Sequence, residues 1–250
     1  MAHEKITLST RDGECPALVF TPEGETAGNG PWPAAIFYMD AFAIRPALVG
    51  MAQRLADLGY VVLLPDLFYR LGDYPELVPA EVFASGDFRG AMGRYMASTD
   101  NKLAAEDTEA FLAYFDTRSD VAGTKVGATG YCMGGGMVLA AAGTWPERIA
   151  AAASFHGGNL VTDQPTSPHL FVPAIKGRVY VAGADHDNSY PPEMAERLEQ
   201  VLTEAGVDHR CEIYPDALHG WTMPDFPIYN RDAAERHWTE LAALFAAELH

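Results

Sequence analysis

The stretch that decides the fold is Thr124-Lys-Val-Gly-Ala-Thr-Gly-Tyr-Cys132-Met-Gly-Gly-Gly-Met-Val-Leu-Ala-Ala-Ala-Gly143. Strand formers and small residues precede the cysteine and helix formers follow it, so the pattern predicts a strand, a sharp turn at Cys132 and a helix. Gly130 and Gly134 lie two residues before and two residues after the cysteine, where only tiny residues fit if strand and helix nearly touch. The pattern therefore predicts a nucleophile elbow that carries cysteine. Its alternative is a buried structural cysteine beside a glycine-rich turn.

The helix that starts after Cys132 bears on the chemistry of the thiol. The N–H groups and the dipole at a helix N-terminus favour a thiolate over a thiol. An ordinary cysteine has a pKa of about 8.5, so only a small fraction of it is thiolate at neutral pH. We expect this cysteine to be a better nucleophile than an ordinary one.

The length and composition fit one domain that spans residues 1–250. With 48% hydrophobic residues the chain can bury a substantial core, and α/β folds of this length form single domains. The 17 basic and 34 acidic residues give a formal net charge of −17. Such a charge disfavours nucleic acid and anionic membrane surfaces as partners. We expect a small-molecule substrate and a monomer or small homo-oligomer.

The first residues and the cysteines indicate the compartment. The first ten residues contain Glu4 and Lys5 and no apolar run, so no secretory leader is expected, and no stretch is long enough to span a bilayer. The cysteines Cys15, Cys132 and Cys211 are widely spaced, which predicts neither a disulfide framework nor a zinc site. We therefore expect a cytoplasmic protein with reduced thiols. Nothing in the sequence indicates a metal ion or an organic cofactor.

The order of the predicted elements indicates an α/β fold. Two short strands on either side of 11–13 predict an antiparallel hairpin. An apolar strand, an amphipathic helix and a second apolar strand follow, and this order implies a right-handed crossover between parallel strands. We predict a mostly parallel twisted sheet with helices on both faces. The predicted strands are 6–9, 17–21, 34–39, 60–64, 126–129, 149–155, 177–182 and 210–214, and the predicted helices are 46–58, 101–116, 133–142, 193–205 and 230–249.

Residues 65–100 interrupt this alternation. The segment reads as irregular, with prolines at Pro65, Pro75 and Pro79 and several aromatic residues. Loops of this length inside compact domains are usually functional. Because the segment has no core of its own, we expect a lid or a pocket wall rather than a second domain.

Two loops after later strands offer an acid and a base for the thiol. Ligands of an open parallel sheet bind at the carboxyl ends of its strands, and both loops lie there. One loop holds Asp185 and Asp187, and the other holds His219. The order nucleophile, acid, histidine is that of α/β-hydrolases. Asp185 is preferred because it stands nearest the strand end, whereas Asp187 could equally be a turn or capping residue.

The chain resembles the dienelactone hydrolases, the carboxymethylenebutenolidase-like branch of the α/β-hydrolases, from the hairpin to the last helix. The resemblance is carried by Gly-Tyr-Cys132-Met-Gly-Gly, Val-Ala-Gly-Ala-Asp185, Leu-His219-Gly and Pro65-Asp66-Leu67. It implies an α/β-hydrolase fold and a triad of Cys132, Asp185 and His219. It also implies hydrolysis of small carboxylic esters or lactones through an acyl-thioester.

The resemblance implies further roles around the thiol. Asp40 takes the place of an acidic residue, a Glu in the family's pattern, that holds the thiol in the resting state. The backbone N–H groups of Met133 and Ala41 are expected to hold the oxyanion. In the founding members arginines bind the carboxylate of the lactone, one of them a few residues after the histidine, whereas Gly-Trp-Thr-Met-Pro follows His219 here. We therefore predict weak or no activity on dienelactone and broader activity on small esters or lactones.

The remaining candidates form the pocket wall. Arg89 and Arg94 of the long segment could supply a cation, but solvated surface charges are their alternative. His156 follows a strand at the same edge of the sheet, and a hydrogen-bonded loop histidine is its alternative. The expected pocket residues are Phe42, Tyr69, Phe88, His156 and Trp221.

Three other functions stay open on the sequence alone. The first is an α/β-hydrolase scaffold that binds a ligand without catalysis, which an unreactive Cys132 would favour. The second is a thiol-based glyoxalase or redox sensor, which also places a cysteine between a strand and a helix. The third is a peptidase.

Overall fold

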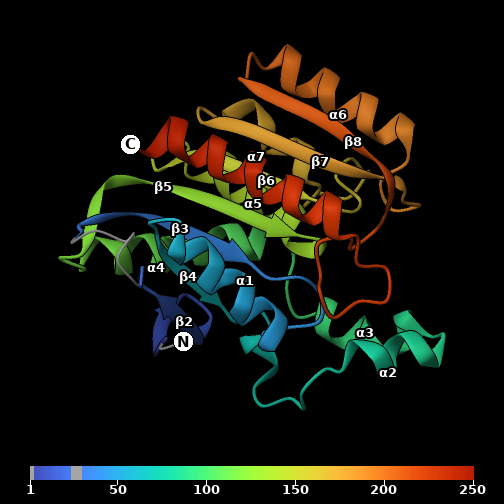
Figure 1. The fold of residues 1–250 in the computed structure, drawn as a ribbon, viewed down its shortest axis with the longest axis horizontal. Coiled ribbons are helices and arrows are strands. Elements are labelled where there is room, and N and C mark those ends of the chain that lie inside the picture. Colours follow the sequence, from blue (N-terminus) through green and yellow to red (C-terminus); the bar gives the residue numbers. More distant parts are fainter. Residues whose placement is uncertain (1–2, 24–29) are drawn as a thin grey trace.

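The structure is a computed structural model that describes residues 3–23 and 30–250. Its centre is an eight-stranded sheet with the strand order β1-β2-β4-β3-β5-β6-β7-β8 (Figure 1). The strands β3 to β8 are parallel, and the first two strands run antiparallel to their neighbours, as predicted. The strands are β1 (Glu4–Thr10), β2 (Gly13–Phe20), β3 (Trp32–Tyr38), β4 (Val61–Pro65), β5 (Val121–Tyr131), β6 (Ile149–Phe155), β7 (Arg178–His186) and β8 (His209–Leu218).

Helices cover both faces of this sheet. The helices α1 (Pro46–Asp57) and α7 (Arg231–Leu249) lie on one face, and α4 (Asn101–Asp116) and α5 (Met133–Thr144) lie on the other (Figure 1). The helix α6 (Pro192–Glu204) packs against β8 at the end of the sheet. The predicted parallel sheet with helices on both faces is confirmed.

Short side chains at the helix starts fix two of these boundaries. The side chain of Asp100 accepts the N–H of Leu103 at the start of α4, and that of Asn230 accepts the N–H of Ala233 at the start of α7. Such caps satisfy N–H groups that have no partner inside the helix. They place the polar ends of both helices at the edge where the strands end.

The segment 65–100 is more regular than predicted. It contains a single helical turn at Tyr69–Leu71 and two short helices, α2 (Pro79–Ser85) and α3 (Phe88–Met96). Proline starts α2, and the side chain of Asp87 caps α3. Helices of seven and nine residues are too short to show a clear apolar period, which is why the sequence pattern did not reveal them.

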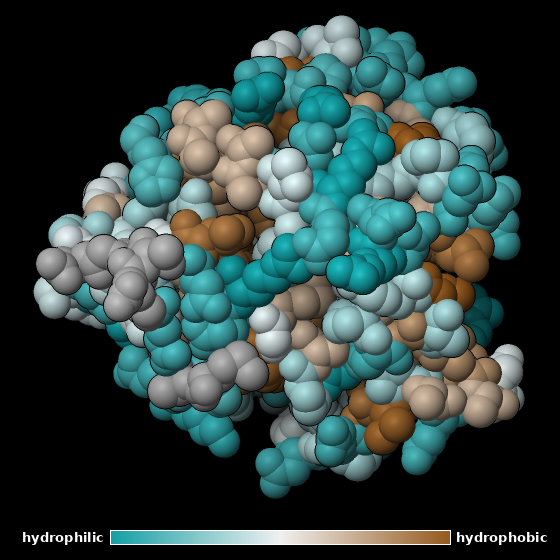
Figure 2. Space-filling view, viewed as in Figure 1, coloured by the Kyte–Doolittle hydropathy of each residue, from teal (hydrophilic) through white to brown (hydrophobic). Residues whose placement is uncertain are grey.

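The core is continuous on both sides of the sheet, and the surface is mostly polar. The largest fully buried side chains include Trp221, Tyr38, Tyr131 and Tyr214. Figure 2 shows a largely hydrophilic face, with a gathering of hydrophobic side chains at the lower right, where α2 and α3 lie. None of the helices in the described ranges combines the length and the apolar character that crossing a bilayer requires.

One buried histidine makes the fold sensitive to acid. His237 of α7 is fully buried, donates through Nδ1 to the carbonyl of Ala234 at 2.6 Å and accepts from the hydroxyl of Tyr131 at 3.0 Å. Burial lowers the pKa of His237 to about 3. The folded protein therefore keeps this imidazole neutral at pH values where the unfolded chain binds a proton.

We predict that the free energy of unfolding falls as the pH is lowered below about 7. An exposed histidine has a pKa of about 6.5, so protons favour the unfolded chain between that value and the folded pKa. His237 alone should account for about 1 kcal/mol between pH 7 and pH 5.5. Urea unfolding at both pH values, compared between the wild type and His237→Gln, measures this contribution. The same substitution at the exposed His186 is the control, and an equal pH dependence in all three proteins would contradict the prediction.

Candidate active site

The turn between β5 and α5 holds Cys132 in a strained conformation. Cys132 has φ 53° and ψ −113°, and such a conformation costs a residue with a side chain about 1–3 kcal/mol. A Cβ atom on Gly130 would lie 2.0 Å from the carbonyl oxygen of Gly134. A Cβ atom on Gly134 would lie 2.4 Å from the carbonyl oxygen of Tyr38 at the end of β3. Only glycine fits at both places, so the structure has the predicted strand, sharp turn and helix.

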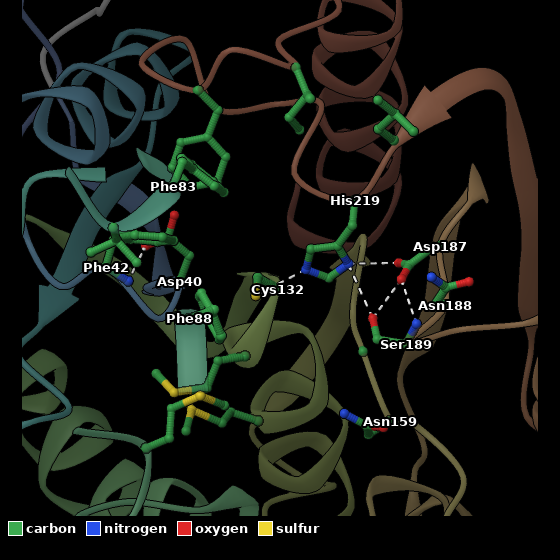
Figure 3. A pocket seen from close by; sticks show the side chains of 18 of the residues that line it. Asp40, Phe42, Phe83, Phe88, Cys132, Asn159, Asp187, Asn188, Ser189 and His219 are labelled. Carbon is green, nitrogen blue, oxygen red and sulfur yellow. Dashed lines mark hydrogen bonds and ion pairs between the residues drawn. The ribbon is translucent and has the colours of Figure 1, made fainter. Parts of the chain in front are cut away.

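His219 links the thiol to a carboxylate. Its Nε2 lies 3.1 Å from Sγ of Cys132, and its Nδ1 lies 2.6 Å from Oδ2 of Asp187 (Figure 3). His219 follows β8, Asp187 follows β7 and Cys132 follows β5, so the three side chains meet at the carboxyl edge of the sheet. A thiol, an imidazole and a carboxylate in this order can move a proton from the thiol and hold it on the imidazole.

The interactions among Cys132, His219 and Asp187 shift the pKa values of the imidazole and of the carboxylate. Burial alone would lower the pKa of His219, but the electrostatic interaction with Cys132 and the hydrogen bonds to Asp187 and Cys132 raise it to about 10. Burial would raise the pKa of Asp187, but the hydrogen bond and charge of His219 and two hydrogen bonds from Ser189 lower it. The contacts of His219 with Asp187 and Cys132 therefore favour the charged form of its imidazole.

Ser189 fixes the carboxylate of Asp187. Its hydroxyl donates to Oδ1 of Asp187 at 2.6 Å, and its backbone N–H donates to the same oxygen at 2.8 Å. The second oxygen, Oδ2, is left for His219. The side chain of Asp187 is 2% exposed, so this orientation is held in a nearly dry place.

Asp185, the predicted acid, does not reach His219, and this prediction is wrong. The strand β7 runs on through His186, so Asp185 lies in the strand and not in the following loop. Its side chain is 46% exposed and accepts the backbone N–H of Asp216 at 3.4 Å. The pairing of β7 with β8, which shifts register at this point, carries the strand past its predicted end. Asp187, the alternative weighed above, is the first residue after the strand.

Asp40 binds an arginine in this structure, and its role in holding the thiol stays a prediction. Both of its oxygens bind the guanidinium of Arg45, at 2.7 and 2.9 Å, and Oδ1 also accepts the N–H of Phe42. The described interactions of Asp40 do not include Cys132. Arg45 is itself buried and also binds Asp225. Asp40 therefore lines the site but is held by the arginine, which the sequence analysis did not single out.

The two predicted oxyanion donors belong to adjoining segments. Met133 is the first residue of α5, so its N–H has no acceptor inside the helix. Ala41 lies in the buried loop after β3. The close contact of Gly134 with the carbonyl of Tyr38 sets this loop beside the helix start. Their role as oxyanion donors stays a prediction.

Three of the five predicted pocket residues do not line the cavity at Cys132. The hydroxyl of Tyr69 forms hydrogen bonds with the side chains of Thr10 and Asp107, neither of which lines the cavity. Trp221 and His156 are fully buried beneath the site, with ring centroids 4.9 Å apart. Sequence spacing placed these side chains at the correct edge but could not show which way they point.

The cavity itself has a volume of about 830 Å³ and contains Cys132 and His219 in its wall. Phe42 and Phe88 line it, as predicted, and Phe83 and Phe226 add two further aromatic rings. The sequence offered a weak signal for these two, because Phe83 lies in the long segment and Phe226 follows His219 in the same loop. The other lining residues are Asp40, Val82, Gly86, Met96, Thr99, Asp100, Asn101, Met133, Met137, Gly158, Asn159, His186, Asp187, Asn188, Ser189, Leu218 and Ile228.

The other two cysteines have thiols whose pKa values are raised. Cys15 is fully buried, and burial together with the charges of Asp107 and Asp66 raises the pKa of its thiol. Burial, with the charge of Glu199, raises the pKa of Cys211 to about 12. We therefore expect labelling with a thiol reagent at neutral pH to report on Cys132.

Comparison with known proteins agrees with this geometry. Residues 15–249 match the model of the dienelactone hydrolase family. The chain belongs to the dienelactone hydrolase family. Its members are hydrolases, so this chain is a hydrolase that acts on a small molecule.

Three relatives of this family member each cover 90% or more of its length. A protein of Synechocystis sp. named "Putative carboxymethylenebutenolidase" is 28% identical over 229 residues, which is 90% of each chain. A Klebsiella pneumoniae structure named "Putative Dienelactone Hydrolase" has a TM-score of 0.82 and 20% identity over 98% of each chain. The dienelactone hydrolase-like promiscuous phosphotriesterase P91, from metagenomic libraries, has a TM-score of 0.75 and 24% identity over 100% of each chain. These two structural likenesses support the α/β-hydrolase fold.

We predict that Asp187→Asn slows the labelling of Cys132 by iodoacetamide at pH 7 about tenfold. Removal of the carboxylate charge lowers the pKa of His219, and a neighbouring opposite charge is typically worth about 1–3 pKa units. The imidazolium that stabilises the thiolate is then less populated. The measurement is the labelling rate as a function of pH.

Asp185→Asn is the matched control for this substitution. It removes the same charge two residues away, where it does not contact His219, and should label like the wild type. Equal labelling rates of the two variants would mean that Asp187 does not set the state of the imidazole.

Proposed function

We propose that this dienelactone hydrolase family member hydrolyses small carboxylic esters or lactones with Cys132 as nucleophile. The observation that carries the proposal is the contact of His219 with both Cys132 and Asp187, at 3.1 and 2.6 Å. A serine or cysteine nucleophile at an elbow, a histidine and a carboxylate are the parts that acyl transfer requires.

In the first half of the proposed reaction, the thiolate of Cys132 attacks the carbonyl carbon of the ester. The carbonyl oxygen becomes an oxyanion, and the N–H groups of Met133 and Ala41 donate to it. Such donors act where charge develops, and the loss of one typically costs about 10²–10³ in rate. His219 then gives the proton on Nε2 to the leaving alkoxide, and the acyl group stays on sulfur as a thioester.

In the second half, water takes the place of the alcohol. The neutral imidazole of His219 removes a proton from the water, which attacks the thioester carbonyl. The C–S bond breaks, the carboxylic acid leaves, and the thiolate–imidazolium pair is restored. Asp187 keeps Nδ1 of the imidazole protonated throughout and so keeps Nε2 facing the reacting atoms.

The segment 65–100 is proposed as the wall that shapes this site. Phe83 of α2 and Phe88 of α3 line the cavity, and each is 42% exposed. When a substrate lies against apolar side chains at the mouth of a cavity, those side chains exclude water from it.

We predict that Cys132→Ala abolishes the hydrolysis of p-nitrophenyl acetate and leaves the fold intact. The expected loss is at least about 10³-fold in kcat/KM, since the covalent step has no other nucleophile. Cys211→Ser is the matched control, because it replaces a cysteine that does not line the cavity, and it should keep wild-type activity. Hydrolysis by Cys132→Ala at the wild-type rate would remove the proposed mechanism.

The hydrolysis assay, combined with thiol labelling and peroxide treatment, separates the other possible roles of Cys132. A protein without ester hydrolysis and with an unlabelled Cys132 at pH 7 would be a binding scaffold. A protein without ester hydrolysis whose Cys132 reacts rapidly with peroxide would be a redox sensor.

A further inference from the structure

The cavity has two chemically different sides, and Cys132 lies between them. Figure 3 shows Phe42, Phe83 and Phe88 on one side of the thiol. On the other side it shows His219 with Asp187, Asn188 and Ser189, and Asn159 below them. The first side is mainly aromatic, with the carboxylate of Asp40 bound to Arg45 beside the rings, and the second offers hydrogen-bonding groups.

The proposed reaction fixes which part of an ester meets which side. His219 supplies the proton of the leaving alkoxide, so the alcohol part has to lie on the side of His219. The acyl part is attached to the same carbonyl carbon and points away from the leaving oxygen. The side of Cys132 away from His219 is the side of the phenylalanines.

The aromatic side is a cluster of phenylalanine rings that pack around Phe42. The ring of Phe42 packs at centroid distances of 5.5, 5.9 and 5.1 Å against Phe83, Phe88 and Phe226. Phe42 and Phe226 are buried, whereas Phe83 and Phe88 leave part of their surface uncovered. The uncovered apolar surface at the wall of the cavity is the area that an apolar acyl group would remove from water.

The described part of the cavity wall offers a substrate carboxylate no lysine or arginine side chain. Arg45, stacked behind the rings of Phe42 and Phe226, is held by Asp40 and Asp225. The candidates Arg89 and Arg94 are exposed and do not line the cavity.

We infer that this site selects esters whose acyl group is uncharged and apolar. The inference rests on the proposed function and adds the acyl specificity to it. A carboxylate at the end of the acyl group would lose its water against phenylalanine rings without gaining a partner, which is costly. An apolar chain of the same length gains from the same burial.

The test compares three p-nitrophenyl esters that share one leaving group. These are the acetate, the hexanoate and the adipate half-ester, whose six-carbon acyl chain ends in a carboxylate instead of a methyl group. We expect kcat/KM for the hexanoate to exceed both other values at least about tenfold. Equal values for hexanoate and adipate half-ester, or a preference for acetate, would overturn the inference.

The Phe83→Ala variant tests whether the aromatic side of the cavity contacts the acyl group. It should lower the ratio of hexanoate to acetate activity at least about threefold, because it removes one face of the aromatic side. Val78→Ala is the matched control, since Val78 precedes α2, is exposed and does not line the cavity. An unchanged ratio in Phe83→Ala would place the acyl group elsewhere and overturn the inference.

Failure of the inference and failure of the proposed function give different results. If all three esters are hydrolysed equally and the activity is lost in Cys132→Ala, the function stands and the acyl specificity falls. If no ester is hydrolysed in a Cys132-dependent way, the proposed function falls, and the inference falls with it.

A second inference concerns His156, which the proposed mechanism does not use. Its Nδ1 accepts the backbone N–H of Cys132 at 3.1 Å, and its Nε2 lies 2.7 Å from the hydroxyl of Thr222. The Cys132 N–H also points to the carbonyl of Phe155. Because Nδ1 accepts, it carries no proton, so Nε2–H donates to Thr222. His156 therefore connects the nucleophile turn with the loop that carries His219.

The conformation of His156 shows that this connection is held against strain. The residue has φ +39° although it carries a side chain, and its side chain is fully buried. Burial, together with the charge of His219, lowers the pKa of His156 well below its usual value, in keeping with a neutral acceptor. Strain of this kind persists only where the surroundings fix it, and it gathers at functional sites.

We propose that His156 is a positioning residue that sets Cys132 relative to His219. His156→Asn keeps an acceptor oxygen near the place of Nδ1, and asparagine tolerates positive φ. His156→Phe fills the space without an acceptor. We expect His156→Phe to lower kcat at least about tenfold with KM within about twofold, and His156→Asn to restore most of kcat.

Two measurements guard this test against a purely structural effect. Thermal unfolding checks that both variants are folded, and iodoacetamide labelling checks the reactivity of Cys132 directly. Wild-type kcat and labelling in His156→Phe, or equal losses in both variants, would contradict the positioning role.

Discussion

The site depends on the contact of three backbone segments around Cys132. The end of β5, the start of α5 and the end of β3 approach so closely that Gly130 and Gly134 have no room for a Cβ atom. Backbone contacts of this kind cannot relax through a change of rotamer. They therefore hold the strained turn at Cys132 and set the loop of Ala41 beside the helix start.

A second constraint is the buried arginine at the start of α1. Arg45 binds Asp40 and Asp225 and lies over the rings of Phe42 and Phe226. It thereby ties the loop after β3 to the loop that follows His219. A buried charge is stable only when its partners are complete, so this guanidinium is not free to bind a substrate anion.

Much of this arrangement was predictable from local patterns. Apolar strands, the glycine spacing around Cys132 and the order of cysteine, aspartate and histidine indicate the parallel sheet, the elbow and the edge where the site lies. The wrong prediction of the catalytic acid shows where local patterns fail. Asp185 and Asp187 both follow an apolar strand, and only the pairing of β7 with β8 decides that the strand continues past Asp185. Local sequence contains no information on that pairing.

The sequence by itself determined the α/β-hydrolase class, the cysteine at the elbow and the histidine at the end of the last strand. These features depend on periodicity and on glycine, which act over a few neighbouring residues. Only the tertiary structure decided that Asp187 meets His219, that Arg45 engages Asp40, and that His156 lies under the nucleophile rather than in the cavity. These contacts join residues far apart in the chain, and the direction of each side chain is set by packing between elements rather than by its neighbours in sequence.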